Sequence, residues 1–202
     1  MSTSTSEPAA SSSAALPAVG SVREVTIEEL GVTWRPGCPV SVEDLRAVTV
    51  RVHDDAGTTK TAELLVHVAV AADIAAIFED IYAAGYPVHE VATAATRGGD
   101  DDLLMAEDVT SAFNCRYVDG TTKWSNHASG RAIDINPFEN PWVRSGARID
   151  PPAAAQFADR TLNEPKLILS DGPVVQAFKA RGWTWGGDWA DPDYQHFERA
   201  NP

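Results

Sequence analysis

The sequence has no apolar run that approaches the roughly 18 to 20 residues needed to cross a bilayer, so no membrane span is expected. Basic residues are scarce, because 16 Lys and Arg stand against 29 Asp and Glu and leave a net charge of −13. This charge argues against binding to nucleic acid, whose phosphates are contacted by Lys and Arg, and against an electrostatic membrane anchor. With 202 residues and no internal repeat, the chain is long enough for one sizeable core.

Cysteine is also rare, with only Cys38 and Cys115 present. One interpretation is a pair of buried free thiols, which behave as small apolar side chains. The other is a single disulfide that closes a long loop and stabilises the fold by up to about 4 kcal/mol. A disulfide would imply an extracytoplasmic setting. The residues alone leave both interpretations open.

Residues 1–20 lack the basic start and apolar centre of a secretory signal peptide, so we expect no such signal. Ser, Ala and Pro dominate this stretch, which is typical of a disordered tail or linker. No second domain boundary follows. We therefore expect one domain over residues 21–202.

Strand-like and helix-like segments do not alternate regularly, which favours an α+β fold with a central antiparallel sheet and flanking helices. Alternating apolar residues and short apolar runs predict strands at 45–54, 61–70, 110–118, 130–136 and 194–198. The turn-forming residues between the first two strands predict a hairpin. Apolar residues at helical spacing predict helices at 71–85 and 171–182, the second with Asp171 as its N-cap.

Two longer segments are expected to be loops. Residues 96–108 are rich in aspartate, which could bind Ca²⁺, although a solvated acidic loop is the preferred interpretation. Residues 140–157 contain several Pro and Gly and predict mostly loop, with Trp142 as a candidate lining of a cleft.

The stretch WSNHASGRAIDIN, residues 124–136, raises a question of charge, because Asp134 lies inside an apolar strand. A buried carboxylate is costly unless it is paired, and a metal ion is one possible partner. A catalytic zinc site needs three protein ligands and one open position. His127, Asp134 and His196 can supply two imidazoles and a carboxylate. The alternative is a buried His–Asp hydrogen bond without a metal.

The other three histidines are weaker candidates for metal ligands. His53 and His67 fall within strand segments and are expected on the faces of a sheet. His89 has no acidic or His partner at a useful spacing. The metal-site hypothesis therefore depends on His127 and His196.

Two further residues are suited to hydrolytic chemistry. Asp193 precedes His196 by three residues and can act as a general base on water beside a metal. Arg116 can hold a carboxylate or a carbonyl oxygen of a substrate, because its guanidinium is a planar two-pronged donor. The alternative for Arg116 is an ordinary salt bridge.

The two histidine segments resemble the motifs of a known family. SNHASGRAIDI is similar to the S-x-H-x-x-G-x-A-x-D motif of the D-alanyl-D-alanine metallopeptidases, and DYQHFE matches their second motif, an acid two residues before His. The order of the motifs and the W-G-G-x-W before the second also agree. The family includes vancomycin-resistance dipeptidases and carboxypeptidases and phage L-alanyl-D-glutamate endolysins. The resemblance covers roughly residues 110–200.

The resemblance implies a Zn²⁺ ion with three protein ligands: His127, Asp134 and His196. It implies Asp193 as the general base and Ser125 as a residue near the substrate or one that orients a ligand. The family also has a substrate arginine before the first motif. Arg116 is its nearest counterpart here, although offset in position, and Arg97 is the second choice.

The function implied by the resemblance is zinc-dependent hydrolysis of peptidoglycan peptides, as a D,D-carboxypeptidase or an L-Ala-D-Glu endopeptidase. Two alternatives remain: a non-catalytic zinc-containing binding or signalling module, as in the Hedgehog domains that share this fold, and a different zinc amidase. We expect a monomer that acts outside the cytoplasm at the cell wall. Release of the phage-endolysin type or an omitted leader would account for the missing signal.

Overall fold

A long antiparallel hairpin begins the fold, as the sequence predicts. β2 (Leu45–His53) and β3 (Thr59–His67) pair along their whole length, and β1 (Val22–Glu24) adds to the free edge of β2. The computed structural model describes residues 17–200, so most of the predicted N-terminal tail, 1–16, lies outside the described residues.

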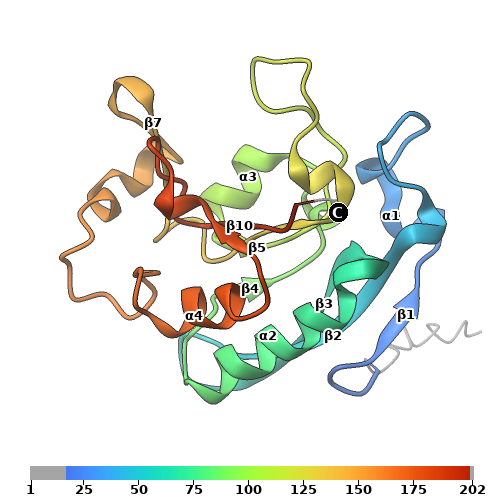
Figure 1. The fold of residues 1–202 in the computed structure, drawn as a ribbon, viewed down its shortest axis with the longest axis horizontal. Coiled ribbons are helices and arrows are strands. Elements are labelled where there is room, and N and C mark those ends of the chain that lie inside the picture. The colour runs from blue at the N-terminus through green and yellow to red at the C-terminus, as the bar shows by residue number, and fades with distance from the viewer. Residues whose placement is uncertain (1–16, 201–202) are drawn as a thin grey trace, which may run out of the picture.

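One helix packs along this hairpin. α2 (Ala71–Ala83) contacts β2 and also α4 (Pro173–Lys179), which lies beside it (Figure 1). Its apolar residues recur at helical spacing, and those facing inward are fully buried: Ile74, Ile77, Phe78 and Ile81. No helix among residues 17–200 is long and apolar enough to cross a membrane.

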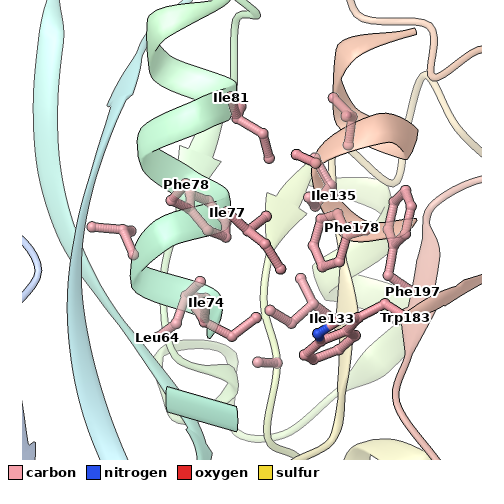
Figure 2. Packing of buried hydrophobic residues seen from close by; sticks show 14 of the residues in the cluster. Leu64, Ile74, Ile77, Phe78, Ile81, Ile133, Ile135, Phe178, Trp183 and Phe197 are labelled. Atoms are coloured by element: carbon pink, nitrogen blue, oxygen red, sulfur yellow. The ribbon is translucent and has the colours of Figure 1, made fainter. Parts of the chain in front are cut away.

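A second small sheet lies on the other side of this helix. Its strand order is β6 (Ala132–Asp134), β10 (His196–Glu198) and β9 (Thr184–Trp185), all antiparallel. Figure 2 shows side chains of α2 pointing toward Ile135 and Phe178, which belong to the layer of this sheet and α4. Ile133 and Ile135 are fully buried in the core.

The remaining elements are short. They are α1 (Ile27–Leu30), β4 (Glu90–Val91), α3 (Asp101–Ala106), β5 (Val109–Thr110), β7 (Trp142–Arg144) and β8 (Arg148–Asp150), with several 3₁₀ turns between them. β4 and β5 form a parallel pair, and β7 and β8 form an antiparallel hairpin.

Two predicted loops contain secondary structure. Within 96–108, the Asp100 side chain accepts a hydrogen bond from Leu103 N and caps α3, whose apolar side is buried. Within 140–157, the hairpin of β7 and β8 turns where Gly146 adopts φ +78°. Both loop predictions were wrong because a cap or a single turn glycine was enough to order a short element.

Two other expected elements are shorter than predicted. The strand at 110–118 ends at Thr110, because the following backbone pairs with several different segments and not with one neighbouring strand. The helix predicted at 171–182 begins at Pro173 with Gly172 as its N-cap, so Asp171 is not the cap. Proline is favoured at the first helical position since its missing N–H has no partner there.

The three histidines outside the candidate centre have structural contacts. His53 stacks on Tyr82 with ring centroids 4.1 Å apart. The ring of His67 accepts a hydrogen bond from Ala69 N. His89 was expected to lack an acidic partner, but its Nδ1 lies 2.5 Å from Asp55 Oδ2, which the turn of the hairpin brings near.

A disulfide links Cys38 to Cys115, with 5.9 Å between the Cα atoms. Both cysteines belong to a second apolar cluster that includes Leu30, Leu45 and Phe113. The bond joins the segment before β2 to the segment that precedes the first His motif.

Removal of this disulfide by the double substitution Cys38→Ser and Cys115→Ser is expected to lower the free energy of unfolding by about 4 kcal/mol, because the bond closes a long loop. Urea unfolding of the variant and of the wild-type protein, with and without reductant, measures the change. An unchanged free energy of unfolding in the variant would contradict the expectation.

A buried ionic cluster lies away from the two His motifs. Lys166 Nζ is 2.8 Å from Glu139 Oε1 and 3.2 Å from Asp108 Oδ2, and both carboxylates are largely buried. Burial and the nearby Glu139 carboxylate raise the pKa of Asp108 to about 7, although Lys166 opposes the shift. Asp108 therefore holds a proton more tightly in the folded protein than in the unfolded chain.

This shift predicts a pH dependence of stability. An Asp in the unfolded chain has a pKa of about 3.9, so between pH ~4 and ~7 the folded state binds more protons than the unfolded state. The free energy of unfolding therefore falls as pH rises through this range, by up to about 1.4 kcal/mol per pH unit. Asp108→Asn should remove the part of this slope that Asp108 contributes, and Asn also tolerates the positive φ at this position. Chemical unfolding of both proteins across this pH range measures the dependence of the free energy of unfolding on pH. Identical slopes in the variant and the wild type would refute the prediction.

Candidate metal centre

The pairing of two strands brings the first two candidate ligands together. β10 pairs with β6 so that His196 lies opposite Asp134, and the two side chains share one face of the sheet. His196 Nδ1 is 3.0 Å from Asp134 Oδ1. The opposite face of the same pair packs Ile133 and Phe197 into the core.

The third ligand comes from the 3₁₀ turn Asn126–Ser129, which ends at Gly130. Gly130 has φ +69°, and a Cβ atom there would lie 2.7 Å from His67 N, so this turn requires glycine. His127 Nε2 then lies 3.1 Å from Asp134 Oδ2 and 3.2 Å from His196 Nδ1.

Both imidazoles are held through the nitrogen that faces away from the centre. His127 Nδ1 lies 2.6 Å from the carbonyl oxygen of Ala112, and His196 Nε2 lies 3.1 Å from Glu198 Oε2. Asn126 Nδ2 donates a hydrogen bond to the same oxygen of Glu198. Such partners fix the tautomer and leave the inward nitrogen available to a metal.

The three side chains fit a divalent metal ion by their donor chemistry. One ligand atom from each of His127, Asp134 and His196 lies within 4.8 Å of the others. Two imidazole nitrogens and one carboxylate oxygen form a typical catalytic zinc set, which leaves a coordination position open.

The charges of the centre are strongly coupled. Burial alone would raise the pKa of Asp134, but the neighbouring His127 and His196 imidazoles hold it well below its usual range. Burial would lower the pKa of His196, but Asp134 and Glu198 raise it to about 10. Any metal bound here must therefore compete with a proton on His196, so its affinity rises with pH.

Asp193 lies beside the centre. Gly186 allows this approach, because a Cβ atom there would lie 2.5 Å from Asp193 O and 3.2 Å from His196 Cβ. Asp193 Oδ1 is buried and has no hydrogen-bond partner among residues 17–200. Burial raises the pKa of Asp193 to about 7; His196 opposes the shift, and the Asp134 and Asp101 carboxylates add to it.

The structure distinguishes between the two candidate arginines. Arg116 lines the pocket at the centre, where its Nη2 lies 2.6 Å from Asp101 Oδ2 and its Nε is buried without a partner in the described chain. Arg116 therefore forms the salt bridge of the alternative interpretation and also lines the pocket, so its role toward a substrate stays a prediction. Arg97 instead pairs with Glu90 and Glu107 and does not line this pocket.

The pocket has a volume of about 200 Å³ and is partly open to solvent. Ser125 lines it and also accepts a hydrogen bond from His127 N, so it orients the ligand turn. Trp142 lines it, as expected, together with Trp189. The other lining residues are Asp101, Met105, Arg116, Val118, Lys123, Asn126, His127, Asp134, Asp193, Gln195, His196 and Glu198.

Sequence reasoning missed five of these polar residues: Asp101, Lys123, Asn126, Gln195 and Glu198. Glu198 could have been found, because two residues along a strand from His196 places it on the same face. Asp101 was assigned to a solvated loop, and its position beside Arg116 depends on the unpredicted helix α3. No local pattern marks Gln195 as a lining residue.

Glu198→Gln is expected to weaken zinc binding by about 10- to 100-fold, because a neutral amide is a poorer acceptor for the His196 imidazole. Competition with a chromophoric chelator measures the affinity. Glu28→Gln, on the exposed side of α1, is the matched control. Equal zinc affinity in both variants would show that Glu198 has no part in the centre.

Comparison with known proteins supports the resemblance of the two His motifs to a peptidase family. Residues 119–199 match the family model described as D-alanyl-D-alanine carboxypeptidase. No curated protein and no solved structure matches the chain. The matched segment contains His127, Asp134, Asp193 and His196, while Arg116 lies just before it. The match over residues 119–199 therefore supports the resemblance of the two His motifs to the D-alanyl-D-alanine metallopeptidases.

Proposed function

We propose that the protein is a zinc-dependent peptidase that hydrolyses peptidoglycan stem peptides, as a D,D-carboxypeptidase or an L-Ala-D-Glu endopeptidase. The observation that carries this proposal is the convergence of His127, Asp134 and His196 beside Asp193, a half-buried carboxylate whose buried Oδ1 has no hydrogen-bond partner within residues 17–200. A structural metal site needs no such carboxylate, whereas hydrolysis needs a group that accepts a proton from water.

A zinc ion held by the three ligands would supply a Lewis acid that polarises a carbonyl group and lowers the pKa of water. Asp193 takes the proton of the attacking water through its free Oδ1. It then returns that proton to the amine that leaves when the peptide C–N bond breaks. The raised pKa of Asp193 suits a group that must both accept and release a proton near neutral pH.

Arg116 is the residue that steadies the oxygen of the scissile carbonyl in this proposal. Its Nε is buried at the pocket and has a free N–H, while Asp101 fixes the other side of the guanidinium. A donor already aligned before the reaction stabilises the developing negative charge without reorganisation. Ser125 contributes by holding the turn that carries His127.

The cellular setting proposed for this activity is extracytoplasmic, at the cell wall where the peptide substrate lies. The disulfide between Cys38 and Cys115 supports this proposal, because such bonds persist in oxidising compartments.

Asp193→Asn should lower kcat by about 10²- to 10⁴-fold and leave zinc binding within about twofold, because it removes the proton acceptor without removing a ligand. Mass spectrometry of a defined pentapeptide stem after incubation with the zinc-loaded protein measures cleavage. Asp191→Asn, on the exposed segment two residues earlier, is the control and should retain activity.

The masses of the products identify the bond. Loss of one D-Ala indicates a carboxypeptidase, and a cut between L-Ala and D-Glu indicates an endopeptidase. If the zinc-loaded wild-type protein leaves the peptide intact, the proposal fails and the non-catalytic binding module becomes the better account.

A further inference from the structure

One wall of the pocket is a short two-stranded loop between the disulfide and the first His motif. Val118 N donates to Lys123 O at 2.9 Å, and Ser125 N donates to Arg116 O at 3.1 Å. Between these two pairs, Tyr117 lies opposite Trp124 as an antiparallel bridge. Residues 116–125 therefore have a defined register.

That register separates the loop into two faces, because side chains alternate along a strand. Tyr117 and Trp124 occupy one face, where their rings stack with centroids 4.1 Å apart and Trp124 packs on the second apolar cluster. The other face points to the pocket, and all its members line it: Arg116, Val118, Lys123 and Ser125. The stacked pair on the far side holds this wall in place.

The two cations of the wall differ in their partners. Arg116 pairs with Asp101 at 2.6 Å. Lys123 has no carboxylate within ion-pair distance anywhere in residues 17–200, whereas Lys60 and Lys179 each pair with an aspartate. The charge of Lys123 is therefore available to a ligand at the mouth of the pocket.

The positive charge of Lys123 matters for binding because its surroundings are negatively charged. The protein carries a net charge of −13, and four carboxylates line the pocket, which would repel an anionic peptide. Two residues that line the pocket, Trp142 and Gln195, each have a buried polar atom, Nε1 and Oε1, with no partner within residues 17–200. An unpaired buried donor and acceptor match the C=O and N–H of a peptide backbone.

We propose that Lys123 binds a free carboxylate of the substrate peptide at this wall. The inference rests on the proposed peptidase function and specifies its substrate as a peptide with a carboxylate near the scissile bond. That carboxylate has two possible sources, the C-terminus of a terminal D-Ala and the α-carboxylate of a γ-linked D-Glu. Lys123 acts in binding, so it sets KM more than kcat.

The test is steady-state kinetics of wild-type protein, Lys123→Gln, Lys123→Arg and the control Lys60→Gln. The substrates are a stem pentapeptide, the same peptide with a C-terminal amide, and the same peptide with D-isoglutamine in place of D-Glu. Lys123→Gln should raise KM for the unmodified peptide about tenfold with kcat within about twofold, while Lys123→Arg and Lys60→Gln stay near wild type.

Amidation of the carboxylate that Lys123 binds should raise the wild-type KM to the same extent and abolish the difference between wild type and Lys123→Gln. The peptide that shows this behaviour identifies the source of the carboxylate. Equal KM values for wild type and Lys123→Gln on the unmodified peptide overturn the inference while leaving the peptidase function intact. If wild-type protein cuts none of the three peptides, the proposed function itself is overturned.

Discussion

The pairing of β10 with β6 is the contact on which the centre depends. It places His196 directly opposite Asp134 on one face and Phe197 opposite Ile133 on the other. The apolar face is anchored by α2 and α4, so the register cannot slip by one residue without turning charged side chains into the core (Figure 2). The core thereby fixes the position of two of the three candidate ligands.

The remaining polar groups are placed by turns whose backbone leaves little freedom. Gly130 and Gly186 stand where a Cβ atom would strike a neighbouring backbone atom, and they allow His127 and Asp193 to approach the sheet. Each imidazole is braced from outside, one by a backbone carbonyl and one by Glu198. A metal site requires ligand atoms that are held in position before the ion binds, and these hydrogen bonds hold the two imidazole rings in this way.

The sequence predicts the parts of this structure that depend on local patterns. Helical spacing identified α2, alternation identified the long hairpin, and the two motifs identified the residues that the fold brings together. Arg116 and Asp101 form a pair that only the tertiary fold creates, because the second residue lies on a short helix with a weak pattern. The strand predicted at 110–118 fails for a similar reason: its backbone is satisfied by scattered long-range partners, which leave no periodic signal.

The most direct test of the central claim is a crystal structure of the protein grown with zinc, with anomalous diffraction recorded at the zinc edge. The account predicts one strong anomalous peak about 2.0 to 2.2 Å from His127 Nε2, His196 Nδ1 and a carboxylate oxygen of Asp134. A peak elsewhere, or none at these three side chains when zinc is bound in solution, would contradict it.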